Sequence, residues 1–149
     1  MSREPGREEA HYRKLETMYQ AAPVTRLYEA RLEVRKGEAR VSLPVKQGFF
    51  HAGGALHGSV YFRALDDAAF FAANSVVVDR FVLTVSFNVY FTRPVKKGVL
   101  TATGRLVHRS RGLLVAEAEL VDERGRQVAR GSGTFLPRGP DLDNDIGYR

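Results

Sequence analysis

The 149-residue sequence contains no cysteine. The chain can therefore form no disulfide, no thiolate metal site and no cysteine nucleophile. Long hydrophobic runs are also missing, since the longest, such as residues 68–73, are far too short to span a bilayer. The N-terminus is charged from its first residues and lacks the pattern of a signal peptide. We therefore expect a cytoplasmic protein with no membrane partner.

Basic runs and metal-ligand patterns are equally scarce. The net charge of +6 favours anionic partners. However, no basic run exceeds Lys96-Lys97 and no nucleic-acid motif occurs, so we expect no nucleic-acid partner. His11 and His108 have no partner at ligand spacing. His51 and His57 match no standard zinc pattern, so no metal is expected either.

Hydrophobic periodicity predicts an α+β fold with one dominant helix. An amphipathic helix is expected over residues 8–22, and two strands within residues 27–45 are separated by a turn at Lys36-Gly37. A long, almost wholly apolar helix follows. Alternating patterns then predict four strands, which we expect to form an antiparallel meander around that helix: 81–92, 99–108, 113–121 and 127–136.

These patterns divide the chain into three segments. Residues 1–24 form an N-terminal helical segment and residues 25–137 the main domain. Residues 138–149 have no periodicity, so we expect a frayed C-terminal tail.

The most informative segment is a glycine-rich stretch, residues 50–59, that leads into the apolar helix of residues 60–75. A helical wheel gathers the polar residues in one sector: Ser59, Arg63, Asp66, Asp67 and Asn74. Buried carboxylates are costly unless they are used. Arg63 and Asp67 are spaced i, i+4, so an ion pair is the expected role of Asp67. Asp66 is then the candidate functional carboxylate.

The start of this helix is a second candidate. At His57-Gly58, free backbone N–H groups and the positive end of the helix dipole favour a developing negative charge. This indicates an oxyanion site for acyl transfer, although the glycines could simply shape a loop. His57 and Asp66 lie about 180° apart on the wheel, so one helix cannot direct both at one substrate atom. If both act, two chains must share the site, and a homodimer becomes part of the prediction.

The order and spacing of these residues resemble those of proteins with the hot-dog fold, in which a curved antiparallel sheet wraps around one long central helix. Within that fold, the chain is similar to the phenylacetate-pathway (PaaI-like) acyl-CoA thioesterases. The resemblance covers residues 38–137 and rests on His57-Gly58, Asp66, Asn74-Ser75, the Thr-Val-Ser-Phe strand at 84–87, Thr92-Arg93-Pro94 and Gly98. It implies an enzyme that hydrolyses an acyl-CoA thioester with no further cofactor. It also implies a homodimer or a dimer of dimers.

The resemblance also implies roles for individual residues. Asp66 takes the place of the carboxylate that activates water or attacks the thioester. The Gly58 amide would polarise the carbonyl, His57 would shape the loop, and Thr84 would help to position water. Coenzyme A phosphates lie at the rim of such sites, and the candidate cations here are Arg93, Lys96, Lys97, Arg109 and Arg111. Four phenylalanines could line an acyl pocket or belong to the core: Phe49, Phe50, Phe70 and Phe71.

Two residues depart from the family pattern. His51 stands where an asparagine usually contacts the thioester, and Ser59 stands where a second glycine is usual. A histidine could donate a hydrogen bond to a carbonyl, or act as an acid or base near neutral pH. The second role would make the protein an enoyl-CoA hydratase or dehydratase that uses His51 and Asp66. A non-catalytic acyl-CoA-binding protein is a third alternative.

Overall fold

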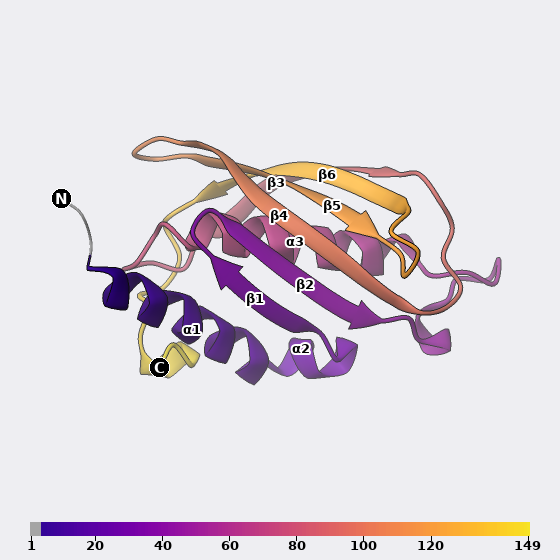
Figure 1. The fold of residues 1–149 in the computed structure, drawn as a ribbon, viewed down its shortest axis with the longest axis horizontal. Helices are drawn as coiled ribbons and strands as arrows, with labels where there is room; N and C mark the ends of the chain where they lie inside the picture. The colour runs from indigo at the N-terminus through magenta and orange to yellow at the C-terminus, as the bar shows by residue number, and fades with distance from the viewer. Residues whose placement is uncertain (1–3) are drawn as a thin grey trace.

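The helix α3 (Gly58–Asn74) lies along the concave face of a curved antiparallel sheet in the computed structural model, which describes residues 4–149 (Figure 1). Its alanines Ala64, Ala68 and Ala72 are fully buried. Apolar side chains surround most of the helix, so it can be stable only when other structure covers it. The predicted hot-dog architecture is confirmed.

The sheet has six strands, in the order β1-β2-β4-β5-β6-β3. Their bounds are β1 Arg31–Arg35, β2 Glu38–Pro44, β3 Leu83–Phe91, β4 Val99–Arg109, β5 Leu114–Val121 and β6 Gln127–Leu136. The expected meander holds for β4, β5 and β6 but is wrong for β3, which pairs with β6 at the far edge. The crossover through α3 carries the chain across the sheet, and local periodicity contains no signal for that step.

The helix α1 (Pro5–Ala21) runs antiparallel to α3 and packs onto it. Near one end, the buried His11 donates from Nε2 to the Asn74 carbonyl at 2.9 Å. Near the other end, the Tyr19 hydroxyl donates to Asp67 Oδ2 at 2.7 Å. The N-terminal segment is thus bonded to the central helix along its length.

A second short helix, α2 (Pro23–Tyr28), follows α1. The two strands expected within residues 27–45 are present, and the first of them begins at Arg31, after this helix. Pro23, expected to end the first helix, also begins the next, because a proline fits the first position of a helix where no N–H is needed.

The C-terminal segment, residues 137–149, packs against the molecule, which corrects the expectation of a frayed tail. Phe81 donates its N–H to the Pro140 carbonyl at 2.9 Å. Further along, the Tyr148 hydroxyl donates to Nδ1 of His11 at 2.7 Å. A short 3-10 helix, η2 (Asn144–Ile146), lies between these contacts. The residues that hold this segment in place are distant from it in sequence. Hydrophobic periodicity, which is a local pattern, therefore could not predict that the segment is ordered.

Asn74 is structural rather than part of a polar face. Its side chain is fully buried at the end of α3. The amide donates to the carbonyls of Val77 and Arg80, and its oxygen accepts from the Val82 N–H, each at 3.0 Å. Asn74 therefore shapes the turn from α3 into β3, and the wheel sector that included it is narrower than expected.

The sheet and α3 approach most closely at Gly104 in β4. A Cβ at this position would overlap with the carbonyl of Ala68. A larger residue there would push the strand and the helix apart, because the atoms in contact belong to the backbone of each element and cannot rotate away. Within residues 4–149, no helix is long and apolar enough to cross a membrane.

We predict that Gly104→Ala lowers the free energy of unfolding by about 1–3 kcal/mol or more, because the added methyl group overpacks the contact with α3. Gly112→Ala is the matched control, since no atom lies within 4 Å of a Cβ there. Urea unfolding of both variants measures the difference. Equal stabilities of the two variants would contradict the close packing of β4 on α3.

Candidate active site

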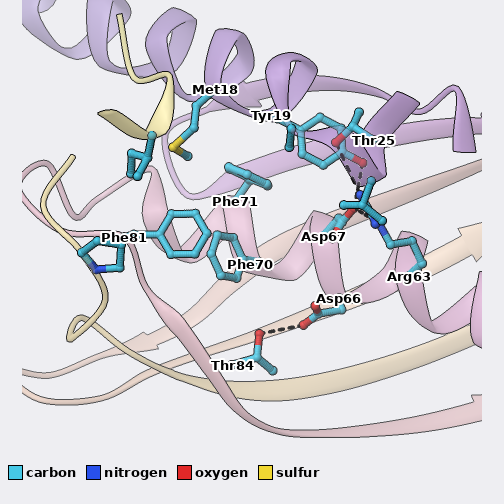
Figure 2. Close-up of a pocket in the computed structure, with 14 residues that line it drawn as sticks. Met18, Tyr19, Thr25, Arg63, Asp66, Asp67, Phe70, Phe71, Phe81 and Thr84 are labelled. Carbon is cyan, nitrogen blue, oxygen red and sulfur yellow. Dashed lines mark hydrogen bonds and ion pairs between the residues drawn. The ribbon is translucent and has the colours of Figure 1, made fainter. Parts of the chain in front are cut away.

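Asp66 points from α3 towards β3, where Thr84 Oγ1 donates to its Oδ1 at 2.9 Å (Figure 2). Burial raises the pKa of Asp66 to about 6, although the Thr84 hydrogen bond favours the charged form and lowers it. The neighbouring Asp67 raises this pKa further. A carboxyl with a pKa near neutrality can exchange a proton at physiological pH.

Asp67 has a different environment from Asp66. Its Oδ2 accepts hydrogen bonds from Arg63 Nε and from the Tyr19 hydroxyl, each at 2.7 Å. The Arg63 and Asp67 side chains are 16% and 14% exposed, so the expected ion pair exists but is mostly buried. Arg63 also stacks on the Tyr28 ring, with its guanidinium carbon 4.9 Å from the centroid. Removing either charge would leave the other buried and unpaired, which is strongly destabilising.

Asp66 and Thr84 open into an apolar cavity of about 500 Å³ (Figure 2). Phe70 and Phe71 of α3 form one wall together with Phe81. The opposite wall comes from the end of α1 and from α2. Phe70, the apolar residue within the polar sector of the wheel, thus lines this cavity.

The loop before α3 contains the second group of predicted residues, and His57 caps the helix. Its Nδ1 accepts the Ser59 N–H at 3.0 Å, and the Ser59 hydroxyl lies 2.8 Å from the same nitrogen. The Val60 N–H bonds to the His57 carbonyl at 3.0 Å. Among the hydrogen bonds of residues 4–149, none uses the Gly58 N–H. The first amide of the helix is therefore available to a ligand.

Gly58 lies in a separate cleft of about 360 Å³, together with His51, Tyr61, Phe91 and Arg93. The Phe91 ring sits against Gly58, 3.1 Å from where a Cβ would be. Because the ring occupies that space, a glycine fits this position best. The cleft thus combines a free backbone amide with an aromatic wall from the end of β3.

His51 is exposed, and one contact indicates which of its two ring nitrogens carries the hydrogen in the neutral ring. Its Nδ1 accepts the Gly53 N–H at 2.9 Å. A ring nitrogen that accepts an N–H carries no hydrogen, so the neutral imidazole carries its hydrogen on Nε2. His51 thus presents a donor, as the side-chain amide of asparagine would.

The five predicted rim cations are exposed but lie in two groups. Arg93 lines the cleft beside Gly58, and Lys96 and Lys97 follow in the same connection. Arg109 and Arg111 lie at the turn between β4 and β5, in a cavity formed with the residues after α3. The two groups thus lie near opposite ends of α3, which is about 25 Å long. One chain does not bring all five together.

The structure also separates the two main candidates, Gly58 and Asp66. They are about 12 Å apart along the axis of α3. They line different cavities. One chain therefore does not bring these two predicted groups to the same substrate atom.

A hot-dog fold with a carboxylate on its central helix is the architecture of a thioester-hydrolase family, and the sequence agrees. The family model of the thioesterase superfamily matches residues 53–129, just over half of the chain. A candidate esterase of Saccharolobus solfataricus is 30% identical over 104 residues, which cover 70% of this chain and 74% of that relative. The chain belongs to the thioesterase superfamily.

Other similar proteins extend this comparison. The 1,4-dihydroxy-2-naphthoyl-CoA hydrolase of Listeria monocytogenes is 31% identical over 93 residues, 62% of this chain and 76% of the relative. The PaaI protein of the E. coli phenylacetic acid degradation operon has a TM-score of 0.82 at 21% identity. That match covers 90% of this chain and 97% of the solved one, and it shows the shared fold.

We predict that Asp66→Asn stabilises the protein at alkaline pH. Because the folded-state pKa of about 6 lies above the ordinary value of 3.8, the folded protein binds this proton more tightly, and stability falls as pH rises through that interval. The neutral amide avoids this loss. We expect a gain in the free energy of unfolding of about 1–2 kcal/mol at pH 8, allowing for solvent screening, and little gain at pH 4. Urea unfolding at both pH values measures it, and equal gains would contradict the raised pKa.

Proposed function

We propose that this protein is an acyl-coenzyme A thioesterase that acts as a homodimer. In each site, Asp66 of one subunit would meet the Gly58 amide of the other. The observation that carries the proposal is the position of Asp66: a carboxyl with a pKa of about 6 lines an apolar cavity large enough for an acyl group. That combination suits attack on an apolar ester near neutral pH.

The chemistry requires the Asp66 carboxylate. It either removes a proton from the attacking water or attacks the thioester carbon itself, and the carbonyl oxygen becomes an oxyanion. The Gly58 N–H would donate to that oxyanion at the helix N-terminus, and His51 Nε2 supplies a second donor. The oxyanion then collapses and the C–S bond breaks. If Asp66 acted as a base, it returns the proton that it took from water to the thiolate. If Asp66 attacked directly, a water molecule hydrolyses the resulting Asp66 anhydride, which releases the acid and regenerates the carboxylate, and the thiolate takes up the proton that is released. His57 contributes by fixing the first turn of α3, and Thr84 by orienting the carboxylate.

The exposed edge of β3 supports the homodimer. Among the described strands, β3 pairs with β6 alone, so the backbone groups of its other edge are unpaired. Its apolar Val85 and Phe91 are 59% and 57% exposed. A second copy that added its own β3 here would cover these side chains and continue the sheet.

The same pairing would complete the active site. Thr84, bonded to Asp66, lies near one end of β3, and Phe91, packed on Gly58, lies at the other end. Two β3 strands paired antiparallel about a twofold axis would bring Thr84 of one copy close to Phe91 of the other. Each Asp66 would then approach the Gly58 of the second subunit.

Coenzyme A would enter at the cleft beside Gly58. Arg93 lines this cleft, and the exposed Lys96 and Lys97 follow in the same connection, so these three cations are our candidates for phosphate contacts. Arg109 and Arg111 remain candidates for a phosphate that extends towards the other end of α3.

The contact at His51 favours a thioesterase over a hydratase or dehydratase. A general base on Nε2 would need that nitrogen free of hydrogen, with the hydrogen on Nδ1. Here the Gly53 N–H already points at Nδ1. His51 is thus arranged to donate to a carbonyl rather than to remove a proton from a substrate carbon.

We predict that Gly58→Pro lowers kcat for acyl-CoA hydrolysis by about 10²- to 10³-fold, the cost of one lost oxyanion donor. Proline suits the first helical position, and His57 at φ −65° and ψ 141° already has a backbone that can precede a proline. The helix should therefore persist while its first N–H disappears. A thiol-release assay over short, long and aromatic acyl-CoAs measures the activity.

Gly58→Ala is the matched control, because it adds the same Cβ against Phe91 but keeps the N–H. We expect it to retain far more activity than the proline variant. Asp66→Asn should remove most hydrolysis. Equal losses in the alanine and proline variants would contradict the oxyanion role of Gly58, and full activity of Asp66→Asn would refute the proposed function.

A further inference from the structure

The apolar cavity at Asp66 is closed by parts of the chain outside the family-matched region. Met18 comes from α1, and Pro140 and Ile146 come from the C-terminal segment. The thioesterase superfamily model matches residues 53–129 only. The family core thus supplies the reacting end of the cavity, and both terminal segments supply its opposite wall.

The residues that line the cavity lie at increasing distance from the Asp66 carboxylate. Phe70 lies one helical turn beyond Asp66, and its ring contacts Phe71 and Phe81 at centroid distances of 5.0 Å and 4.8 Å. Figure 2 shows Met18 on the far side of these rings from the Asp66–Thr84 pair. An acyl chain that extends from the thioester carbonyl into this cavity would therefore pass the phenylalanines before it reaches Met18.

The terminal segments are held firmly enough to act as a wall. The hydrogen bond from Tyr19 to Asp67 fastens α1 to α3 directly beside Asp66. The hydrogen bond from Tyr148 to His11 fastens the C-terminal segment to α1. Next to Ile146, a Cβ at Gly147 would lie 3.6 Å from the Met18 Cα, so the two segments are in direct contact.

We propose that Met18 and Ile146 form the end wall of the acyl-binding cavity and set the upper limit on acyl length. This inference rests on the proposed function. The wall is apolar, so it suits the methyl end of a hydrocarbon chain or a ring without charge. A chain that is too long must displace a packed wall, whereas a short chain never reaches it. Among acyl-CoAs that differ only in length, kcat/KM should therefore fall sharply beyond one chain length.

The test compares how kcat/KM depends on acyl length in two variants, one with a larger and one with a smaller side chain at Ile146. Ile146→Trp should enlarge the wall and shift the longest efficiently hydrolysed saturated acyl-CoA to fewer carbons, with kcat/KM falling about tenfold for each methylene that no longer fits. Ile146→Ala should shift the limit to more carbons. The two variants should differ from each other far less on butyryl-CoA than on the long acyl-CoAs, because the short chain ends before the wall.

Leu27→Trp and Leu27→Ala are the matched controls, since Leu27 lies on α2, is 60% exposed and does not line the cavity. They should leave the profile unchanged. Ile146 variants with the wild-type profile, or with equal losses at every acyl length, would overturn the inference while thioesterase activity stands. If the wild type released no thiol at all, the proposed function would fail instead. Calorimetric binding of the same acyl-CoA series to the Ile146 variants would then support or overturn the end wall.

Discussion

The direct contact between α3 and the sheet determines the rest of the structure. Gly104 leaves room for the helix backbone, and the alanines of α3 present almost no side chain to the strands. A helix seated this deeply has only a narrow sector free of the sheet. Asp66, Asp67 and Arg63 emerge in that sector, where they line a cavity together with residues of α1, α2 and the C-terminal segment. Burial in this setting raises the pKa of Asp66 to about 6.

With the proposed function, one chain would not form a complete active site. The free amide at the start of α3 and the carboxylate in its middle line different cavities, and a rigid helix cannot bring them together. Asp66 contacts β3 at Thr84 and Gly58 contacts it at Phe91, near opposite ends of the strand. Each contact would be one half-site of the proposed shared site, beside the edge of β3 that has no partner among the described strands. A second copy on that edge would supply each half-site with its missing counterpart, so dimer assembly and catalysis would depend on one surface.

Local signals in the sequence predicted most elements, and the failures involve contacts between distant residues. The strand β6 has the expected bounds, because its pattern is local. The pairing of Asp67 with Arg63 follows from their spacing, but the Tyr19 hydroxyl, 48 residues away, carries no such signal. Thr84 was a candidate only through the family resemblance. The order of residues 137–149 depends on hydrogen bonds to the residues before β3 and to His11 of α1, which no periodicity records.

Subunit complementation tests the central claim, a site shared between two chains, most directly. Asp66→Asn and Gly58→Pro are each expected to be nearly inactive alone. After the two are unfolded together, refolded and mixed, each heterodimer would hold one intact site, with Asp66 from one chain and Gly58 from the other. Random pairing should then restore roughly a quarter of wild-type thiol release per chain. Activity no greater than the sum of the two separate variants would contradict the shared site.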